Sequence, residues 1–262
     1  MKRSFFEDGY YIYKSDPRIA TWAKAAIPLA ADALEDQEML AKWLMCEGTW
    51  FVGVDALATG PKGEAGDSPL AGEVISDLVD YLPTVKPMHR GQLSVVYPGY
   101  PKPRDGESKA AFRYRAIRDA AHVDGLHAVG ADRRRKLSEH HAYLLGLPLT
   151  TCNAAASPLV AWRGSHIIVQ DWLRSEFEGI AADHWGEVDL TDAYLEIRRK
   201  IFDTCERVTL WVEPGQAVLL HRHALHGIAP WGESAVASPH GRMIAYFRPE
   251  ISSDLSQWLY SA

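Results

Sequence analysis

The segment AHVDG contains two side chains that could bind a metal ion together, His122 and Asp124. Alternate residues of an extended strand point to the same face, so the two side chains would project together and Val123 would pack on the opposite side. An imidazole nitrogen and a carboxylate oxygen suit iron(II), and one more histidine would complete a facial set of two histidines and one carboxylate. By itself, such a pair is more commonly a structural hydrogen bond between histidine and aspartate.

Candidates for a third ligand lie further along the chain, in the segment LLHRHALHG. It contains His221, His223 and His226. Because His221 and His223 would share one strand face, a zinc site formed by these three histidines, as in a zinc-dependent hydrolase, is an alternative. For His221 and His223 we favour a packing role.

Several segments, in this order, resemble the phytanoyl-CoA dioxygenase-like family of iron(II)- and 2-oxoglutarate-dependent dioxygenases. The resemblance runs from about Gln92 to Phe247 and rests on HVDG, PLVAWRGSH and PGQAVLLHRHALHG. The second segment resembles the family's Pro-Gly-Ser-His turn, with Arg163 in place of the proline. The third resembles its Gly-Asp segment that ends in His-Gly. The ordered set is more specific than any one of its parts.

The resemblance implies a complete site. His122, Asp124 and His226 would be the catalytic iron ligands, and Arg242 in GRMIAYF would bind the distal carboxylate of 2-oxoglutarate. A guanidinium suits that role because its fixed fork can hold a carboxylate through two parallel hydrogen bonds. The spacing from His226 to Arg242 is longer than usual in the family. Arg248, nearer the end of the same predicted strand, is the alternative.

The implied activity is an oxidation of a small molecule. Iron(II) would be the cofactor, 2-oxoglutarate and O2 the cosubstrates, and succinate and CO2 the products of 2-oxoglutarate. The presence of Asp124 favours hydroxylation or a related oxidation over halogenation, because related halogenases carry a small residue at that place. A jelly-roll protein that binds a small molecule without turnover is the alternative from another functional class.

Other polar residues near these segments have less specific interpretations. We expect His166 in WRGSH to be structural, and the remaining nearby histidines to contact the ligands or the substrate. Basic residues flank HVDG on both sides, and they predict either a solvated surface or a patch that attracts an acidic substrate. These nearby residues are His127, His140 and His141, and Arg113, Arg115, Arg118 and 133–136.

The first part of the chain, 1–86, is predicted to be mainly helical. Residues 17–45 carry apolar side chains at helical spacing, with Asp16 as the N-cap and Pro17 at the first helical position. Pro28 is expected to split this segment into two helices. A loop over 54–70 and a short helix with Val74, Leu78 and Leu82 on one face are expected to follow.

From Pro87 onward, short segments rich in valine, leucine and aromatic residues predict strands. The turn 213–215 predicts a hairpin between RVTLWV and QAVLLHRH, and a helical insertion is expected at about 168–205. This pattern favours an antiparallel sandwich or barrel, and the resemblance implies a double-stranded β-helix (a cupin-like jelly roll) over 87–250, in one domain 1–262. The strand segments are QLSVVYP, HAYLLGLPL, PLVAWRG, RVTLWV, QAVLLHRH and RMIAYFRP.

Composition limits the partners and the compartment. The 262 residues include 28 Lys and Arg against 34 Asp and Glu, a net charge of −6, so we expect a small soluble substrate rather than nucleic acid or an anionic membrane. The three cysteines are far apart and form no C-x-x-C pair, which suits a reducing compartment. No apolar run approaches the roughly 20 residues that span a bilayer, so the expected location is the cytoplasm.

Overall fold

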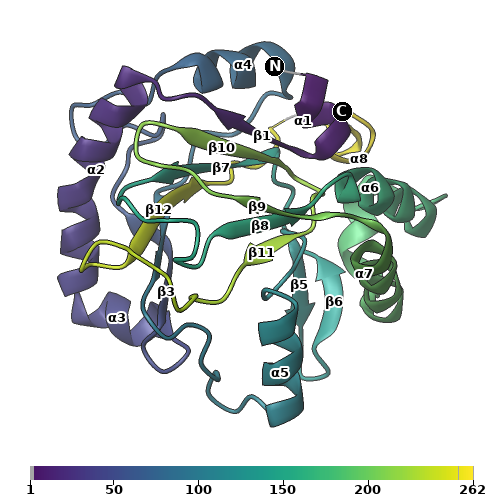
Figure 1. Cartoon of the computed structure of the whole chain (residues 1–262). Helices are drawn as coiled ribbons and strands as arrows, with labels where there is room; N and C mark the ends of the chain where they lie inside the picture. Colours follow the sequence, from purple (N-terminus) through teal and green to yellow (C-terminus); the bar gives the residue numbers. More distant parts are fainter. Residues whose placement is uncertain (1–2, 253, 262) are drawn as a thin grey trace.

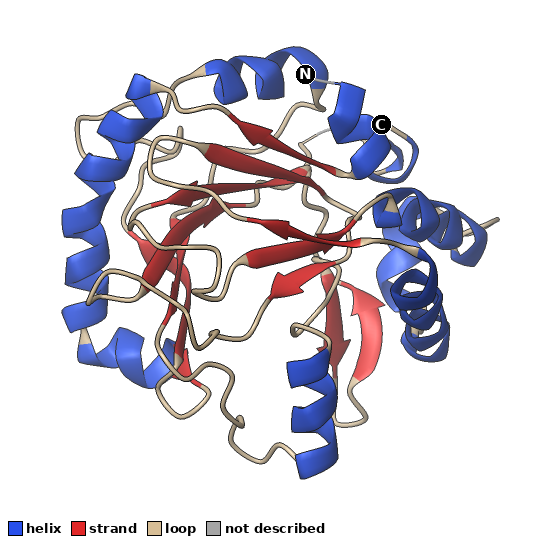
Figure 2. Cartoon of the chain, in the orientation of Figure 1, coloured by secondary structure: helices blue, strands red, loops and turns tan. Residues whose placement is uncertain are grey.

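The computed structural model describes residues 3–252 and 254–261 and contains helices arranged around two facing sheets (Figure 2). The helices are α1 (Arg3–Asp8), α2 (Pro17–Glu35), α3 (Gln37–Trp43), α4 (Glu73–Tyr81), α5 (Lys109–Ile117), α6 (Ser165–Glu176), the 3-10 helix η1 (Ala182–Glu187), α7 (Thr191–Thr204) and α8 (Ser256–Tyr260). The strands are β1 (Tyr10–Tyr13), β2 (Leu44–Met45), β3 (Trp50–Leu57), β4 (Gly91–Val96), β5 (Leu126–Val129), β6 (Arg134–Leu137), β7 (Tyr143–Pro148), β8 (Leu159–Trp162), β9 (Arg207–Leu210), β10 (Ala217–His221), β11 (His226–Ile228) and β12 (Arg242–Phe247).

The two larger sheets form a double-stranded β-helix, the predicted jelly roll (Figure 1). The large sheet has the order β1-β10-β7-β12-β4-β3-β2, and the smaller one has the order β11-β8-β9. Leu144 and Leu220 of the large sheet pack against Leu159 and Leu210 of the smaller one, so apolar side chains join the two layers. Helices α2 and α3 lie along the outer side of the large sheet (Figure 1).

Helix α2 begins as predicted but does not end at its proline. The Asp16 side chain accepts a hydrogen bond from the Arg18 backbone N–H at 2.9 Å, and Pro17 occupies the first turn. The expected break at Pro28 was wrong: Pro28 lies on the exposed side of a continuous helix. The missing N–H and the ring are tolerated there because the affected turn faces solvent. The helix ends instead at Asp36, whose carboxylate caps α3.

The N-terminal region also contributes strands that the sequence pattern did not predict. Strand β1 pairs with β10 at one edge of the large sheet, and β3 pairs with β4. The expected loop over 54–70 therefore begins only after Leu57. The predicted short helix is α4, which buries Val74 and Leu78. A one-sided amphipathic pattern was absent from β3 because both of its faces are largely covered.

The predicted hairpin was wrong, although both of its strands exist. Strand β9 pairs with β8, whereas β10 pairs with β1 and β7 in the other sheet. The turn at Pro214 and Gly215 is therefore the corner at which the chain passes from one sheet to the other. Gly215 has a φ of +97°, and its carbonyl accepts a hydrogen bond from the Asp16 N–H at 2.9 Å.

Beyond the sheets, α6, η1 and α7 form the helical insertion predicted at about 168–205. Helix α5 and the hairpin of β5 and β6 were not predicted, and they flank the segment that contains His122. Over the described ranges, 3–252 and 254–261, no helix is both long and apolar enough to cross a membrane.

Candidate metal centre

His122, Asp124 and His226 come together at one end of the jelly roll. Each offers one ligand atom, and these atoms all lie within 4.8 Å of one another. In the part of the chain that the structure describes, this is the one group of histidine, cysteine and acidic side chains arranged to hold a metal ion. The three metal ligands expected from the sequence are therefore neighbours in space.

Backbone pairing explains why the two histidines meet. His122 donates its backbone N–H to the His226 carbonyl at 2.8 Å, and His226 donates to the His122 carbonyl at 3.0 Å. Directly paired residues of antiparallel strands present their side chains on the same face. The imidazole centroids consequently lie 4.6 Å apart.

Gly227 permits this close approach. A Cβ at this position would lie 2.2 Å from the Asp119 carbonyl oxygen and 3.1 Å from the Ala121 Cα. Any larger residue would push the two segments apart. Steric exclusion therefore explains the glycine after the third histidine: only a residue without a side chain lets the strand of His226 lie against the segment that leads to His122.

Hydrogen bonds fix both imidazoles for metal binding. His122 Nδ1 lies 3.1 Å from the Ala120 carbonyl oxygen, and His226 Nδ1 lies 3.0 Å from the Ala224 carbonyl oxygen. A carbonyl only accepts, so Nδ1 carries a proton in each ring, and Nε2 is the nitrogen that faces Asp124. Burial lowers the pKa of His226 to about 4, with a smaller effect of His122 in the same direction. His226 is therefore neutral near pH 7, as a ligand must be.

Asp124 is buried and uses its two oxygens differently. Oδ1 lies 3.0 Å from His122 Nε2 and 3.7 Å from His226 Nε2, whereas Oδ2 lies 3.3 Å from Arg248 Nη1. Burial alone would raise the pKa of this carboxyl group, but Arg248 and the two histidines outweigh burial and hold the pKa well below its usual value. Val123, between the two candidate ligands, is buried and belongs to the main apolar core.

The other histidines of the predicted segments have structural positions. His221 and His223 are fully buried, and His223 packs against the edge of Trp258 with ring centroids 4.6 Å apart. His166 places Nε2 3.0 Å from the Phe6 carbonyl oxygen, and its ring contacts the His221 ring at a tilt, with centroids 4.8 Å apart. The alternative zinc site of His221, His223 and His226 therefore has no support in the geometry.

An inner cavity of about 260 Å³ lies between the two sheets and reaches all three candidate ligands. Its polar wall includes Arg248 and Tyr246, and the Tyr246 hydroxyl is buried without a hydrogen-bond partner among the described residues. Arg248, the alternative to Arg242, thus lies beside the metal ligands. Further lining residues are Trp50, Val52, Val54, Gln92, Ser94, His127, Glu139, Leu144, Leu159, Gly227 and Ile228.

Arg242 is buried on the same face of β12 as Tyr246 but does not line the inner cavity. It is 3% exposed, and its Nη1 has no hydrogen-bond partner within the described ranges. A buried guanidinium without an acceptor is costly and is typical of a site for an anionic ligand. The expectation that Arg242 binds a carboxylate stays a prediction, because its side chain lies at the wall of neither cavity.

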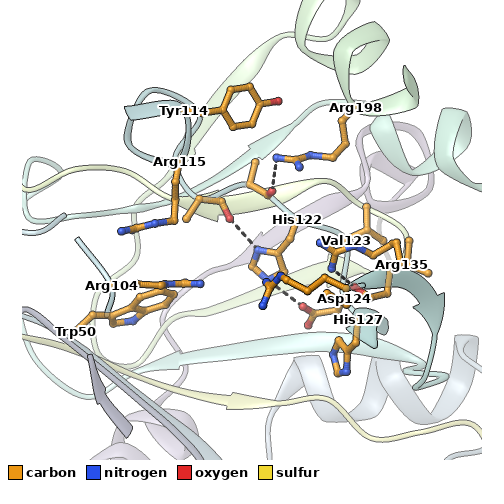
Figure 3. A pocket seen from close by; sticks show the side chains of 15 residues that line it. Trp50, Arg104, Tyr114, Arg115, His122, Val123, Asp124, His127, Arg135 and Arg198 are labelled. Carbon is orange, nitrogen blue, oxygen red and sulfur yellow. Dashed lines mark hydrogen bonds and ion pairs between the residues drawn. The ribbon is translucent and has the colours of Figure 1, made fainter. Parts of the chain in front are cut away.

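A second, outer cavity of about 520 Å³ opens on the other side of His122 (Figure 3). It shares Trp50, His122, Asp124 and His127 with the inner cavity, so the two cavities meet at the candidate ligands. His127 lies 3.4 Å from Glu139, and His141, 2.9 Å from the same glutamate, does not line either cavity. Arg104, Tyr114 and Arg198 were not predicted, because residues from separate elements form this wall.

Comparison with known proteins shows similarity of fold. No protein-family model matches the sequence, and no curated protein matches it. The non-heme alpha-ketoglutarate-dependent carbocyclase SnoK from nogalamycin biosynthesis superposes with a TM-score of 0.51 at 15% identity, covering 95% of this chain and 82% of SnoK.

Two further solved structures are similar over most of the chain. EctD from S. alaskensis, solved with 2-oxoglutarate and 5-hydroxyectoine, has a TM-score of 0.42 at 16% identity, over 94% of this chain and 73% of EctD. AviO1 from Streptomyces viridochromogenes Tue57 has a TM-score of 0.45 at 14% identity, over 96% and 94% of the two chains. The structural neighbours thus include non-heme iron and 2-oxoglutarate enzymes, and the likeness to SnoK shows the double-stranded β-helix.

Proposed function

We propose that this protein is an iron(II)- and 2-oxoglutarate-dependent oxygenase that acts on a small molecule. The observation that carries the proposal is the convergence of His122, Asp124 and His226, with both Nε2 atoms and one carboxylate oxygen directed at a common point. Two imidazoles and one carboxylate on one face suit iron(II) and leave other coordination positions open. This set also matches the family resemblance of the sequence.

The chain's own groups prepare the metal site in three ways. The carbonyls of Ala120 and Ala224 orient the imidazoles, and burial keeps His226 neutral. Arg248 holds Oδ2 of Asp124, which leaves Oδ1 as the oxygen that faces the histidines. Such outer partners fix the geometry of ligands and tune their affinity for the metal.

The inner cavity is the proposed site for 2-oxoglutarate. It lies against the ligands, and Tyr246 and Arg248 give it polar groups that can contact a dicarboxylate. We assign the distal carboxylate to Arg242, because the buried Nη1 of its guanidinium lacks a hydrogen-bond partner within the described residues and the residue shares a strand face with Tyr246. Its side chain would have to turn toward the cavity when the cosubstrate binds.

The substrate would enter from the outer cavity and reach the metal beside His122, whose side chain is 47% exposed there. When bound, iron(II) would use 2-oxoglutarate and O2 to oxidise a C–H bond of the substrate, and 2-oxoglutarate would be converted to succinate and CO2. The protein contributes orientation and exclusion of water. Apolar side chains such as Leu144, Leu159 and Ile228 serve that exclusion on the inner side.

Anaerobic titration with iron(II) and 2-oxoglutarate tests the proposal. We expect a weak visible charge-transfer band that requires both additions, and a matching binding isotherm in calorimetry. Without a band and without 2-oxoglutarate binding, the oxygenase proposal fails. A band without O2-dependent succinate formation, even with a metabolite extract added, would instead favour a binding protein without turnover.

A further inference from the structure

Five arginines line the outer cavity, and they come from separate parts of the fold (Figure 3). Arg104 precedes α5, Arg115 lies on α5, and Arg198 lies on α7, while the other two belong to the hairpin of β5 and β6. Figure 3 shows labelled guanidinium groups on several sides of the His122 imidazole. Convergence from distant segments distinguishes this arrangement from a run of basic residues along one surface loop.

Most of the positive charge in this cavity is not balanced by carboxylates, although Arg115 pairs with Glu107. Asp124 is the one carboxylate among the lining residues, and it belongs to the candidate metal site. Arg133, Arg135 and Arg198 make no ion pair with a carboxylate in the part of the chain that the structure describes. Uncompensated charge in a concave site attracts and concentrates a ligand of opposite sign.

Two of these guanidinium groups are held in place by backbone carbonyls. Arg198 Nη2 donates to the Ala121 carbonyl at 2.8 Å, and Arg135 Nη1 donates to the Leu126 carbonyl at 2.7 Å. Burial, together with Arg198 and Arg133, lowers the pKa of Arg135, which places the three charges near one another. The groups are thus fixed before a ligand arrives, which reduces the entropic cost of binding.

Arg115 is also held in place, by an ion pair and by a backbone carbonyl. Glu107 accepts from its Nε at 2.8 Å and from its Nη2 at 2.7 Å. Nη2 also donates to the Lys102 carbonyl at 2.8 Å. These bonds fix the guanidinium at the wall of the outer cavity.

We propose that the outer cavity binds the anionic end of the substrate, a group with at least two negative charges of the diphosphate or polycarboxylate type. Guanidinium forks are suited to both, because each presents paired N–H donors to paired oxygens. This assignment rests on the proposed function, since the remaining part of the same molecule would extend to His122 and Asp124, where the two cavities meet.

The test uses inorganic pyrophosphate and the tricarboxylate tricarballylate as probes of the full-length protein. Calorimetry is performed at low ionic strength without iron or 2-oxoglutarate, so the result does not depend on the oxygenase proposal. We expect binding of at least one probe. Tighter binding of pyrophosphate would indicate a phosphate group, and tighter binding of tricarballylate would indicate carboxylates.

Variants of one hairpin give the matched comparison. Arg133→Gln changes an exposed side chain and is expected to weaken binding about fivefold, and adding Arg135→Gln is expected to bring the loss to at least about thirtyfold. Arg134→Gln is the control, because this neighbouring arginine pairs with Asp189 and does not line the cavity. Absence of binding to the unaltered protein, or an equal loss in Arg134→Gln, would overturn the proposal.

Discussion

Arg248 Nη1 lies 3.3 Å from Oδ2 of Asp124, the carboxylate oxygen opposite the one that faces His122 and His226. The two residues are 124 positions apart in the sequence, and both are largely buried. The guanidinium therefore does two things at once. It keeps Asp124 ionised in a buried site, and it restricts the carboxylate to presenting one oxygen toward the histidines.

Replacement of this arginine should weaken metal binding. We expect Arg248→Met to reduce iron(II) affinity by about 10- to 100-fold, the usual effect of losing the partner of a metal ligand, and Arg248→Lys to restore part of it. Competition with a coloured chelator under anaerobic conditions measures this affinity. Unchanged affinity in Arg248→Met would show that Asp124 does not need the ion pair.

Replacement of Arg242 should lower the affinity for 2-oxoglutarate rather than the affinity for iron(II). Because its buried Nη1 lacks a partner in the described residues, removing the guanidinium in Arg242→Met should cost little stability but lower 2-oxoglutarate affinity at least tenfold. Iron(II) affinity should stay the same. The measurement is the charge-transfer band as a function of 2-oxoglutarate concentration. If Arg248→Met abolishes that band at saturating iron while Arg242→Met does not alter it, the carboxylate contact belongs to Arg248.

The candidate ligands and the nearby packing histidines should respond differently to substitution. Asp124→Ala removes one of the three candidate metal ligands. It should abolish iron retention and also the succinate formation that occurs in the absence of substrate. His223→Ala should retain iron and lower the free energy of unfolding by less than about 2 kcal/mol, because loss of two buried ring nitrogens without partners among the described residues offsets the cavity left beside Trp258. Iron content and urea denaturation give the two readouts. Equal loss of iron in both variants would mean that the ligand histidines are wrongly assigned.

Gly227→Ala tests the close approach that brings the histidines together. Its Cβ would meet the Asp119 carbonyl oxygen at 2.2 Å, so we expect a loss of about 2 to 3 kcal/mol and a parallel loss of iron affinity. Gly106→Ala is the control, since that glycine has a φ of +70° but nothing within 4 Å. It should cost about 1 kcal/mol from backbone strain alone. Equal melting temperatures for the two variants would contradict the steric explanation.

The sequence predicted the strands better than their partners. RVTLWV and QAVLLHRH are recognisable as strands because β-branched and apolar residues lie between glycine and proline. Their sheet membership depends on contacts far along the chain, such as Leu210 with Leu159 and Val218 with Gly146. A local turn at Pro214 therefore could not distinguish a hairpin from a corner.

The same limit applied to the site. The spacing of His122 and Asp124 predicted that they share a face, because that property is local. The contact of Arg248 with Asp124 and the wall formed by Arg104 and Arg198 depend on the tertiary arrangement of separate elements. Only the chemical types of those residues were visible in advance.

The ion pair behind Arg115 gives a prediction for pH. The hydrogen bonds from Arg115 lower the pKa of Glu107 from 4.5 to about 2. A carboxyl group whose pKa is lower in the folded state than in the unfolded chain stabilises the protein at any pH above its unfolded-state pKa. That stabilisation is lost as the pH falls from about 4.5 toward 2. Glu107→Gln should therefore cost roughly 1 to 2 kcal/mol at pH 7, after allowance for solvent screening.

The difference between the unaltered protein and Glu107→Gln should shrink as the pH is lowered. Urea denaturation from pH 7 to pH 3 measures it, with the exposed Glu178→Gln as a control for the loss of one surface charge. Because Glu107 also holds Arg115 at the wall of the outer cavity, the same variant should weaken pyrophosphate binding at pH 7. A stability difference that stays constant with pH would show that Glu107 contributes through packing rather than through its charge.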